Sequence, residues 1–298
     1  MSGSTLNVPV TVTGLHGRPI STAAPAAGNG LLFDGTTWNY GGVIPSTPNA
    51  PVAGDVLVYD GSAWNPAQLA ARNFIDNSGF TVNQRGYTSG TALAANAYGF
   101  DRWKAGGSGC TLTFTATPAS TPVTIGSGSL IQVVEGESLL TGQYTLSWAG
   151  TAVCSVGALT NVASPVQVGA AAGSDLIITF SGGTLGQVQL QLGTVATPWQ
   201  PQPTQVELAR CQRFFSGTYN WMLGGWGQAG IGNIFMFFFP VIMRATPSVN
   251  FQITAQNNLG YNDPAVSQIT VAGFAAGGGV GATGGYVASG VYNAMADL

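Results

Sequence analysis

The chain has 298 residues, of which 45% are apolar and only 6% are charged, with 8 basic and 11 acidic side chains. An average soluble domain has roughly 25% charged residues, so a core can form while Gly, Ser, Thr, Asn and Gln supply most of the surface. The formal charge of −3 offers no basic surface to nucleic acid or to an anionic membrane. With His16 as its single histidine, the chain cannot build a histidine-rich metal site, and we expect neither a metal nor a cofactor.

The three cysteines match no zinc or redox spacing. Cys110 and Cys154 could pair across strands, whereas the odd number of cysteines favours buried thiols. Residues 1–14 have no cationic start and no apolar run, so we expect no secretory signal. The most apolar segment, 231–243, is too short to span a bilayer. We therefore expect a soluble protein that is assembled in a cytoplasm and does not insert into a membrane.

A short repeat occurs in the N-terminal region, where residues 31–39 (LLFDGTTWN) align with residues 57–65 (LVYDGSAWN). Each copy has an apolar strand, an Asp-Gly pair suited to a tight hairpin turn, and a returning Trp. A hairpin of this size cannot bury its own aromatic residues, so they need a neighbouring repeat or another copy of the chain. Such units resemble short repeats of bacteriophage tail-fibre proteins, and we predict that residues 1–70 attach the chain to other virion proteins.

Four ordered segments resemble a module of phage tail-fibre and other virion proteins. They read NFIDNSGFTVNQRG (73–86), YGFDRW (98–103), LGTVATPWQP (192–201) and ELARCQRFF (207–215). The resemblance implies a jelly-roll β-sandwich of the carbohydrate-binding-module type over residues 71–201. The chain departs from the family pattern at Gln202, where the family often has Arg, and at its Phe-Phe pair, where the family usually has Tyr.

The same region predicts a β-sandwich without the family. Apolar and polar residues alternate over 111–116, 143–148 and 187–192, and clusters of Gly, Ser, Pro and Asn separate these strands. Asp101 and Arg102 are interpreted as charged residues that fasten loops around a buried Trp103; the alternative is a ligand site.

Glu135 and Glu137 form the closest pair of carboxylates, placed on one face of a predicted strand with a bend at Gly136. Glycoside hydrolysis uses two carboxyl groups, but no further catalytic residues lie near them in the sequence. We interpret the pair as a solvated face and predict no catalytic residues.

Residues 202–215 predict a linking helix of roughly three turns. Thr204 and Glu207 have the spacing of a capping box, in which each side chain bonds the backbone N–H of the other residue.

Residues 216–298 predict a C-terminal β-domain with few charges. The run Phe235–Phe239 is apolar on both faces of a strand, so both faces need cover, and a homotrimer would supply it. Aromatic residues set among Gly and Asn are candidates for an exposed surface that stacks on sugars, and the alternative for each is the core of the trimer. The candidate ligand-binding residues are Tyr219, Trp221, Trp226, Tyr261 and Asp263.

The sequence therefore predicts an all-β, trimeric fibre or spike protein of a tailed phage, located in the virion, which recognises a host cell-surface glycan without catalysis. One alternative is a capsule-degrading enzyme that uses Glu135, Glu137 or Asp263. Another is a structural head fibre or decoration protein that has no ligand.

Overall fold

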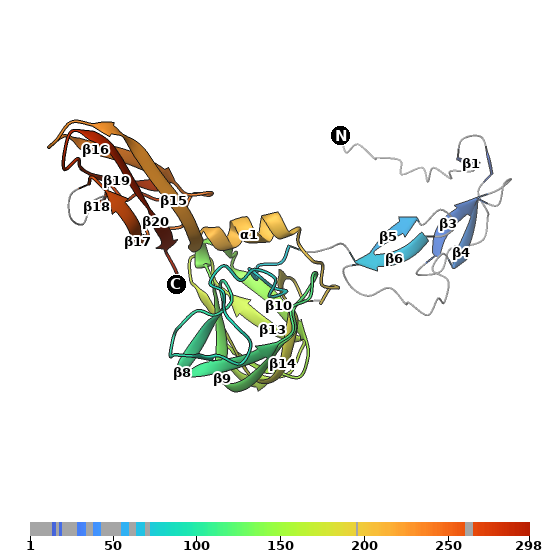
Figure 1. The fold of residues 1–298 in the computed structure, drawn as a ribbon. Helices are drawn as coiled ribbons and strands as arrows, with labels where there is room; N and C mark the ends of the chain where they lie inside the picture. Colours follow the sequence, from blue (N-terminus) through green and yellow to red (C-terminus); the bar gives the residue numbers. More distant parts are fainter. Residues whose placement is uncertain are drawn as a thin grey trace, which may run out of the picture. The chain divides into compact units, whose positions relative to one another are not determined.

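The computed structural model describes residues 72–194, 196–259 and 265–298 with their side chains, and six short strands before residue 69 by their backbone (Figure 1). The chain divides into two compact units, Met1–Leu69 and Ala70–Leu298. The first unit contains three antiparallel pairs of strands: β1 (Gly14–Leu15) with β2 (Arg18–Pro19), β3 (Asn29–Phe33) with β4 (Trp38–Gly42), and β5 (Asp55–Tyr59) with β6 (Trp64–Gln68).

The two hairpins predicted from the sequence repeat are confirmed. In β3–β4, Phe33 lies opposite Trp38, and in β5–β6, Tyr59 lies opposite Trp64. Each Asp-Gly pair therefore lies in the connection between its two strands. The predicted packing of these aromatic side chains falls outside the residues described with side chains.

The second unit begins with an antiparallel β-sandwich whose longest strand joins both of its layers. The first half of β14 pairs with β9 and β11, and the second half pairs with β10. The pairing with β9 shifts register between Ser181 and Gly183, where Gly182 and Gly183 adopt positive φ, as a bend in a strand requires. The strands are β7 (Ala92–Leu93), β8 (Lys104–Phe114), β9 (Val123–Val134), β10 (Gly142–Ala149), β11 (Val153–Val156), β12 (Leu159–Val162), β13 (Val166–Ala170) and β14 (Leu176–Leu192).

Trp103 lies at the centre of the sandwich core and is fully buried, as predicted. Its ring stacks on Phe80 at 4.7 Å between centroids, and its Nε1 donates to the carbonyl of Asn77 at 3.0 Å. Asp101 is buried beside it and accepts hydrogen bonds from the backbone and the side chain of Gln84. The interpretation of Asp101 as a residue that fastens a loop is therefore confirmed.

The three cysteines are free and buried, which confirms the interpretation of buried thiols. Cys110 and Cys154 lie on strands β8 and β11, and neither forms a disulfide. Burial raises the pKa of the Cys110 thiol to about 11 and that of the Cys154 thiol to about 12.

The linking helix α1 spans Thr204–Gln212, but the predicted capping box is wrong. The residue before the first turn is Pro203, and no side chain caps the helix. Glu207 is buried, and its carboxylate accepts the backbone N–H of Asn77 at 2.5 Å instead of returning to its own helix. A tertiary partner thus replaces the local one.

The C-terminal strands form two three-stranded antiparallel sheets, in the orders β15-β20-β17 and β16-β19-β18. Aromatic rings of the two sheets meet between them: the ring centroid of Phe237 in β16 lies 5.7 Å from those of Phe251 in β17 and Tyr292 in β20. The strands are β15 (Phe215–Gly227), β16 (Gly232–Phe238), β17 (Ser248–Asn257), β18 (Ala265–Ser267), β19 (Gly273–Gly279) and β20 (Gly284–Met295).

This arrangement corrects one part of the argument for a trimer. The inner face of β16 does not need a second chain, because Phe237 packs on Trp221 and Tyr292 of the other sheet in the same chain. The outer face remains exposed at Ile234, Met236 and Phe238. The sheet β15-β20-β17 of the same chain therefore covers the inner face of β16, and the outer face of β16 is left to solvent.

Candidate functional site

Most of the positive charge of the chain gathers at one place, where α1 meets the sandwich. Five of the 8 basic residues take part in a network of ion pairs or line the cavity beside it. In a chain with 6% charged residues, this concentration marks a site where charge has a specific task. The five are Arg72, Arg102, Arg210, Arg213 and Arg244, and their acidic partners are Asp76, Glu135 and Glu207.

Asp76 is the first centre of the network. Its carboxylate pairs with Arg102 Nε at 3.0 Å and with Arg210 Nη2 at 2.7 Å. The side-chain amide of Gln132 fixes the backbone of Asp76, since it accepts the N–H at 2.9 Å and donates to the carbonyl at 2.8 Å. Asp76 is thus held in place by strand β9 and pairs with an arginine of α1.

Arg102 is the buried arginine of the network. Its guanidinium carbon lies 3.4 Å from the centroid of the Phe214 ring, and Nη2 donates to the carbonyl of Val133 at 2.6 Å. The residue has φ of 72°, a left-handed conformation. The prediction that Arg102 fastens loops is confirmed, and its contact with Phe214 extends the fastening to the chain after α1.

Glu135 is the second centre, and the prediction that it belongs to a solvated face is wrong. It is buried, and its carboxylate pairs with Arg213 Nη1 at 3.1 Å and Arg244 Nε at 2.8 Å. Glu137 is exposed and lies in a 3₁₀ turn, Gly136–Ser138, so the two glutamates do not share a strand face. Strand β9 ends at Val134, and the backbone N–H of Gly136 donates to Asp175 Oδ1 at 2.8 Å.

Burial raises the pKa of the Glu207 carboxyl, and the hydrogen bond from the Asn77 N–H opposes this shift. Arg210 also opposes it from 4.0 Å, whereas nearby Asp76 adds to it. Glu207 is therefore a buried acid that connects α1 to the loop before strand β7.

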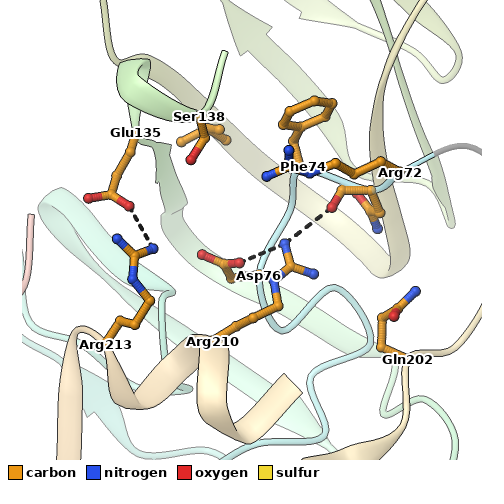
Figure 2. A pocket seen from close by; sticks show the side chains of 10 residues that line it. Arg72, Phe74, Asp76, Glu135, Ser138, Gln202, Arg210 and Arg213 are labelled. Carbon is orange, nitrogen blue, oxygen red and sulfur yellow. Dashed lines mark hydrogen bonds and ion pairs between the residues drawn. The ribbon is translucent and has the colours of Figure 1, made fainter. Parts of the chain in front are cut away.

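An open polar cavity of about 420 Å³ lies between the two centres (Figure 2). Arg210 and Arg213 enter it from the end of α1, and Glu135 faces Arg213 across it. The full lining is Arg72, Asn73, Phe74, Asp76, Val134, Glu135, Ser138, Gln202, Arg210 and Arg213. Three arginines against two carboxylates give this lining a formal charge of +1.

The cavity contains donors that the protein does not use fully. Arg72 is exposed, and its guanidinium carbon lies 4.6 Å from the centroid of the Phe74 ring. The side chain of Arg213 is 43% exposed although it pairs with Glu135. Gln202 and Ser138 add an amide and a hydroxyl group. This set can hold an anionic group through guanidinium N–H donors and can bond neighbouring hydroxyls.

A wider depression of about 750 Å³ lies between α1 and residues 241–244. Its lining includes Val206 and Ile242, which are both exposed and apolar. It shares Arg210 and Arg213 with the first cavity and adds Arg244 and Gln205, but most of its surface is apolar. The first cavity, whose surface is mainly polar, is therefore the better candidate for a polar ligand.

The predicted ligand-binding residues do not form part of this cavity. Trp221 is buried in the C-terminal core, so the prediction that it is exposed is wrong. Tyr219 is half-buried and accepts a hydrogen bond from Gln212 Nε2 at 2.9 Å, whereas Trp226 is 72% exposed. Tyr261 and Asp263 lie outside the described residues.

The sequence analysis missed the arginines that line the cavity. Arg210 and Arg213 enter the sequence argument only through the segment that resembles virion proteins, and no sequence pattern singles out Arg72. The available signal was the clustering of cations near positions 72 and 210–213 in a chain that has so few.

No family model matches this chain, and no curated protein matches it. Two solved structures of discoidin II from Dictyostelium discoideum are similar at 12% sequence identity. The recombinant form covers 76% of this chain and 94% of its own, with a TM-score of 0.22. The wild-type form covers 84% and 100%, with a TM-score of 0.21.

In the part of the chain that the structure describes, no helix has the length and apolar content needed to span a membrane. The same residues contain no group of three or more His, Cys, Asp and Glu side chains that could hold a metal ion.

Proposed function

We propose that this protein is a non-catalytic virion fibre or spike protein of a tailed phage that binds an acidic glycan of the host surface in the cavity at the end of α1. The observation that carries the proposal is the cavity itself, in which three arginines converge in a chain that has 8 basic residues. The order of the four sequence segments that resemble virion proteins supports the assignment to a fibre or spike.

The chemistry of the lining favours an acidic sugar over a neutral one. Guanidinium groups bind carboxylates and sulfates through paired, charge-assisted hydrogen bonds. Arg72 is exposed and the side chain of Arg213 is partly exposed at the cavity, and Gln202 can bond to a ring hydroxyl. A uronic or sialic acid carries both kinds of group within a few ångströms.

The alternative of a polysaccharide-degrading enzyme has less support at this cavity. Asp76 accepts from Arg102 and Arg210, and Glu135 accepts from Arg213 and Arg244. Carboxylates engaged in this way are not free for acid–base catalysis on a ligand. Binding without turnover is therefore the function we propose.

Titration of the full chain with glucuronate, with glucose as the neutral comparison, tests the binding. We expect saturable binding of glucuronate that weakens with salt. The double variant Arg72→Gln, Arg213→Gln should lose at least about tenfold in affinity, since charge-assisted hydrogen bonds contribute about 1.5–3 kcal/mol each. Trp226→Ala is the matched control and should bind as the wild type does.

The opposite result for these variants would place the ligand site outside the cavity at the end of α1. If Trp226→Ala abolished binding while the double arginine variant kept it, the exposed aromatic surface of the C-terminal domain would be the ligand site. Release of reducing ends from an acidic polysaccharide would favour the enzyme, and no binding of any acidic sugar would favour the structural fibre or decoration protein.

The position in the virion needs a separate experiment. We propose that residues 1–70 attach the chain to other virion proteins and that the chain is a homotrimer assembled in the host cytoplasm. Antibody against the C-terminal domain should label the outer ends of fibres on intact particles. Labelling only after particles are disrupted would contradict this orientation.

A further inference from the structure

Strand β16 presents an exposed apolar ridge on the outer side of its sheet. Ile234, Met236 and Phe238 are 68%, 54% and 71% exposed. We call these three residues patch 1. Small residues lie opposite them in register, so the ridge stands above its neighbouring strand β19. The opposing residues are Gly277, Ala275 and Gly273.

The other sheet has a second exposed apolar cluster. Met222 and Trp226 of β15 are 77% and 72% exposed and lie on the same outer face, since they are four residues apart in one strand. Val287 of β20 lies opposite Gly224, between them, and is 42% exposed. We call Met222, Trp226 and Val287 patch 2.

The two patches lie on opposite sides of the C-terminal domain. The inner faces of the two sheets meet through aromatic contacts such as Trp221 of β15 with Phe237 of β16, at 6.3 Å between centroids. Patch 1 and patch 2 are formed by residues that alternate with these inner ones. Each patch is therefore on the outer face of its own sheet.

The exposed area of each patch fits one half of a protein interface. With about 200 Å² for a large side chain, within the range for buried aromatic residues, each patch exposes roughly 400 Å² of apolar surface. A standard interface buries about 800 Å² on each partner, of which about 57% is non-polar. The largest apolar patch on a typical monomer is about 300–600 Å² and often functional, and this domain has two patches of that size.

The charges of the domain indicate what kind of partner fits. Within residues 216–259 and 265–298, the charged side chains are Arg244 and Asp297. Arg244 pairs with Glu135 and Asp297 with Arg85, so both charges are used within the chain. The described outer faces thus repel neither each other nor a second copy, and they offer a charged partner nothing to pair with.

We propose that patch 1 of one copy packs against patch 2 of the next copy. A symmetric contact of either patch with itself would leave the other patch exposed on every copy. A head-to-tail contact uses both, and it closes into a ring when the rotation between copies allows closure. This inference rests on the homotrimer of the proposed function, names its contact, and is independent of glycan binding.

Charge placed on one patch at a time tests the contact. The variants are Met236→Asp in patch 1 and Met222→Asp in patch 2, and Gln252→Asp on the outer face of β17 is the control for added charge. We expect light scattering to show an oligomer for the wild type and the control, and a single chain of 30.3 kDa for each patch variant. An equimolar mixture of the two patch variants should recover a 1:1 complex, because it retains one intact pair of patches.

Disulfide trapping provides a measurement that does not depend on contacts elsewhere in the chain. The double variant Met222→Cys, Met236→Cys should form covalent oligomers under mild oxidation, whereas each single variant should not. The three native thiols are buried and should not interfere. Covalent dimers of a single variant, or a wild type that is monomeric, would overturn the proposal. Glucuronate binding is measured separately on the monomeric variants. Because it does not depend on the contact between the patches, its presence or absence tests the glycan proposal alone.

Discussion

Arg102 provides a direct test of how the sandwich is fastened to the chain that follows it. Its side chain is 2% exposed and pairs with Asp76, which is 15% exposed. It also donates to the carbonyl of Val133, and its guanidinium carbon lies 3.4 Å from the centroid of the Phe214 ring. Replacing Arg102 with Ala removes all three contacts at once and leaves the backbone strain of its positive φ unchanged.

The loss of stability in Arg102→Ala depends on the ion pairs that Asp76 keeps. Breaking a buried ion pair by removing one partner costs about 3–5 kcal/mol. Asp76 keeps Arg210 as a second partner at 2.7 Å, so we expect the lower end of this range, about 3 kcal/mol. For a unit of this size that loss lowers the melting temperature by about 10 °C. Arg102→Lys keeps the charge but not the guanidinium contacts with Phe214 and Val133, and should lose about 2 kcal/mol.

Thermal and urea denaturation of the full chain measure these losses. Arg72→Ala is the matched control, because Arg72 is exposed and its ring contact with Phe74 contributes about 1 kcal/mol or less. If Arg102→Ala destabilised the protein no more than Arg72→Ala, the buried network would not fasten the sandwich, and the reasoning would be refuted.

Three other predictions concern buried groups. Burial raises the pKa of the Glu207 carboxyl above its ordinary value of 4.5, so the folded protein favours the protonated form. The contribution of Glu207 to the free energy of unfolding is therefore greatest below pH 4.5 and is lost as pH rises through the raised pKa. Glu207→Gln should flatten the fall in unfolding free energy that occurs as pH rises above 4.5, and an unchanged profile would contradict this. Trp221→Ala should cost the C-terminal domain about 3–5 kcal/mol, and a loss below about 1 kcal/mol in urea denaturation would show that its stacking is not structural. With the thiol pKa raised to about 11 for Cys110 and about 12 for Cys154, Ellman's reagent should label neither until the protein is denatured; rapid labelling of the native protein would disprove their burial.

The alternation over residues 187–192 predicts a strand correctly but does not predict that its polar face is buried. Residues 187–192 alternate, and they form the end of β14 as predicted. Gln189 and Gln191 lie on the polar side of this alternation but are buried. The reason is Thr197, which accepts from Gln189 at 2.7 Å and donates to Gln191 at 2.7 Å. A later segment of the chain covers the face that alternation alone would assign to solvent.

The candidate site shows the same limit at longer range. Glu135 and Arg244 are 109 residues apart in the chain, and Glu207 and Asn77 are 130 apart. Nothing in the local sequence around Glu207 distinguishes a cap of its own helix from a bond to a distant loop. The capping box and the solvated glutamate pair were therefore wrong for one reason, since each was inferred from neighbours along the chain.

The sequence by itself determined the all-β class, the two N-terminal hairpins, the linking helix and the buried Trp103. Each of these depends on alternation, turn chemistry or apolar content within about ten residues, which are local properties of the chain. Only the tertiary structure decided which charges meet, where the polar cavity opens and which face of β16 stays exposed. Those outcomes depend on strands and loops that are distant in sequence, because ion pairs and packed faces form only where the topology brings their partners together.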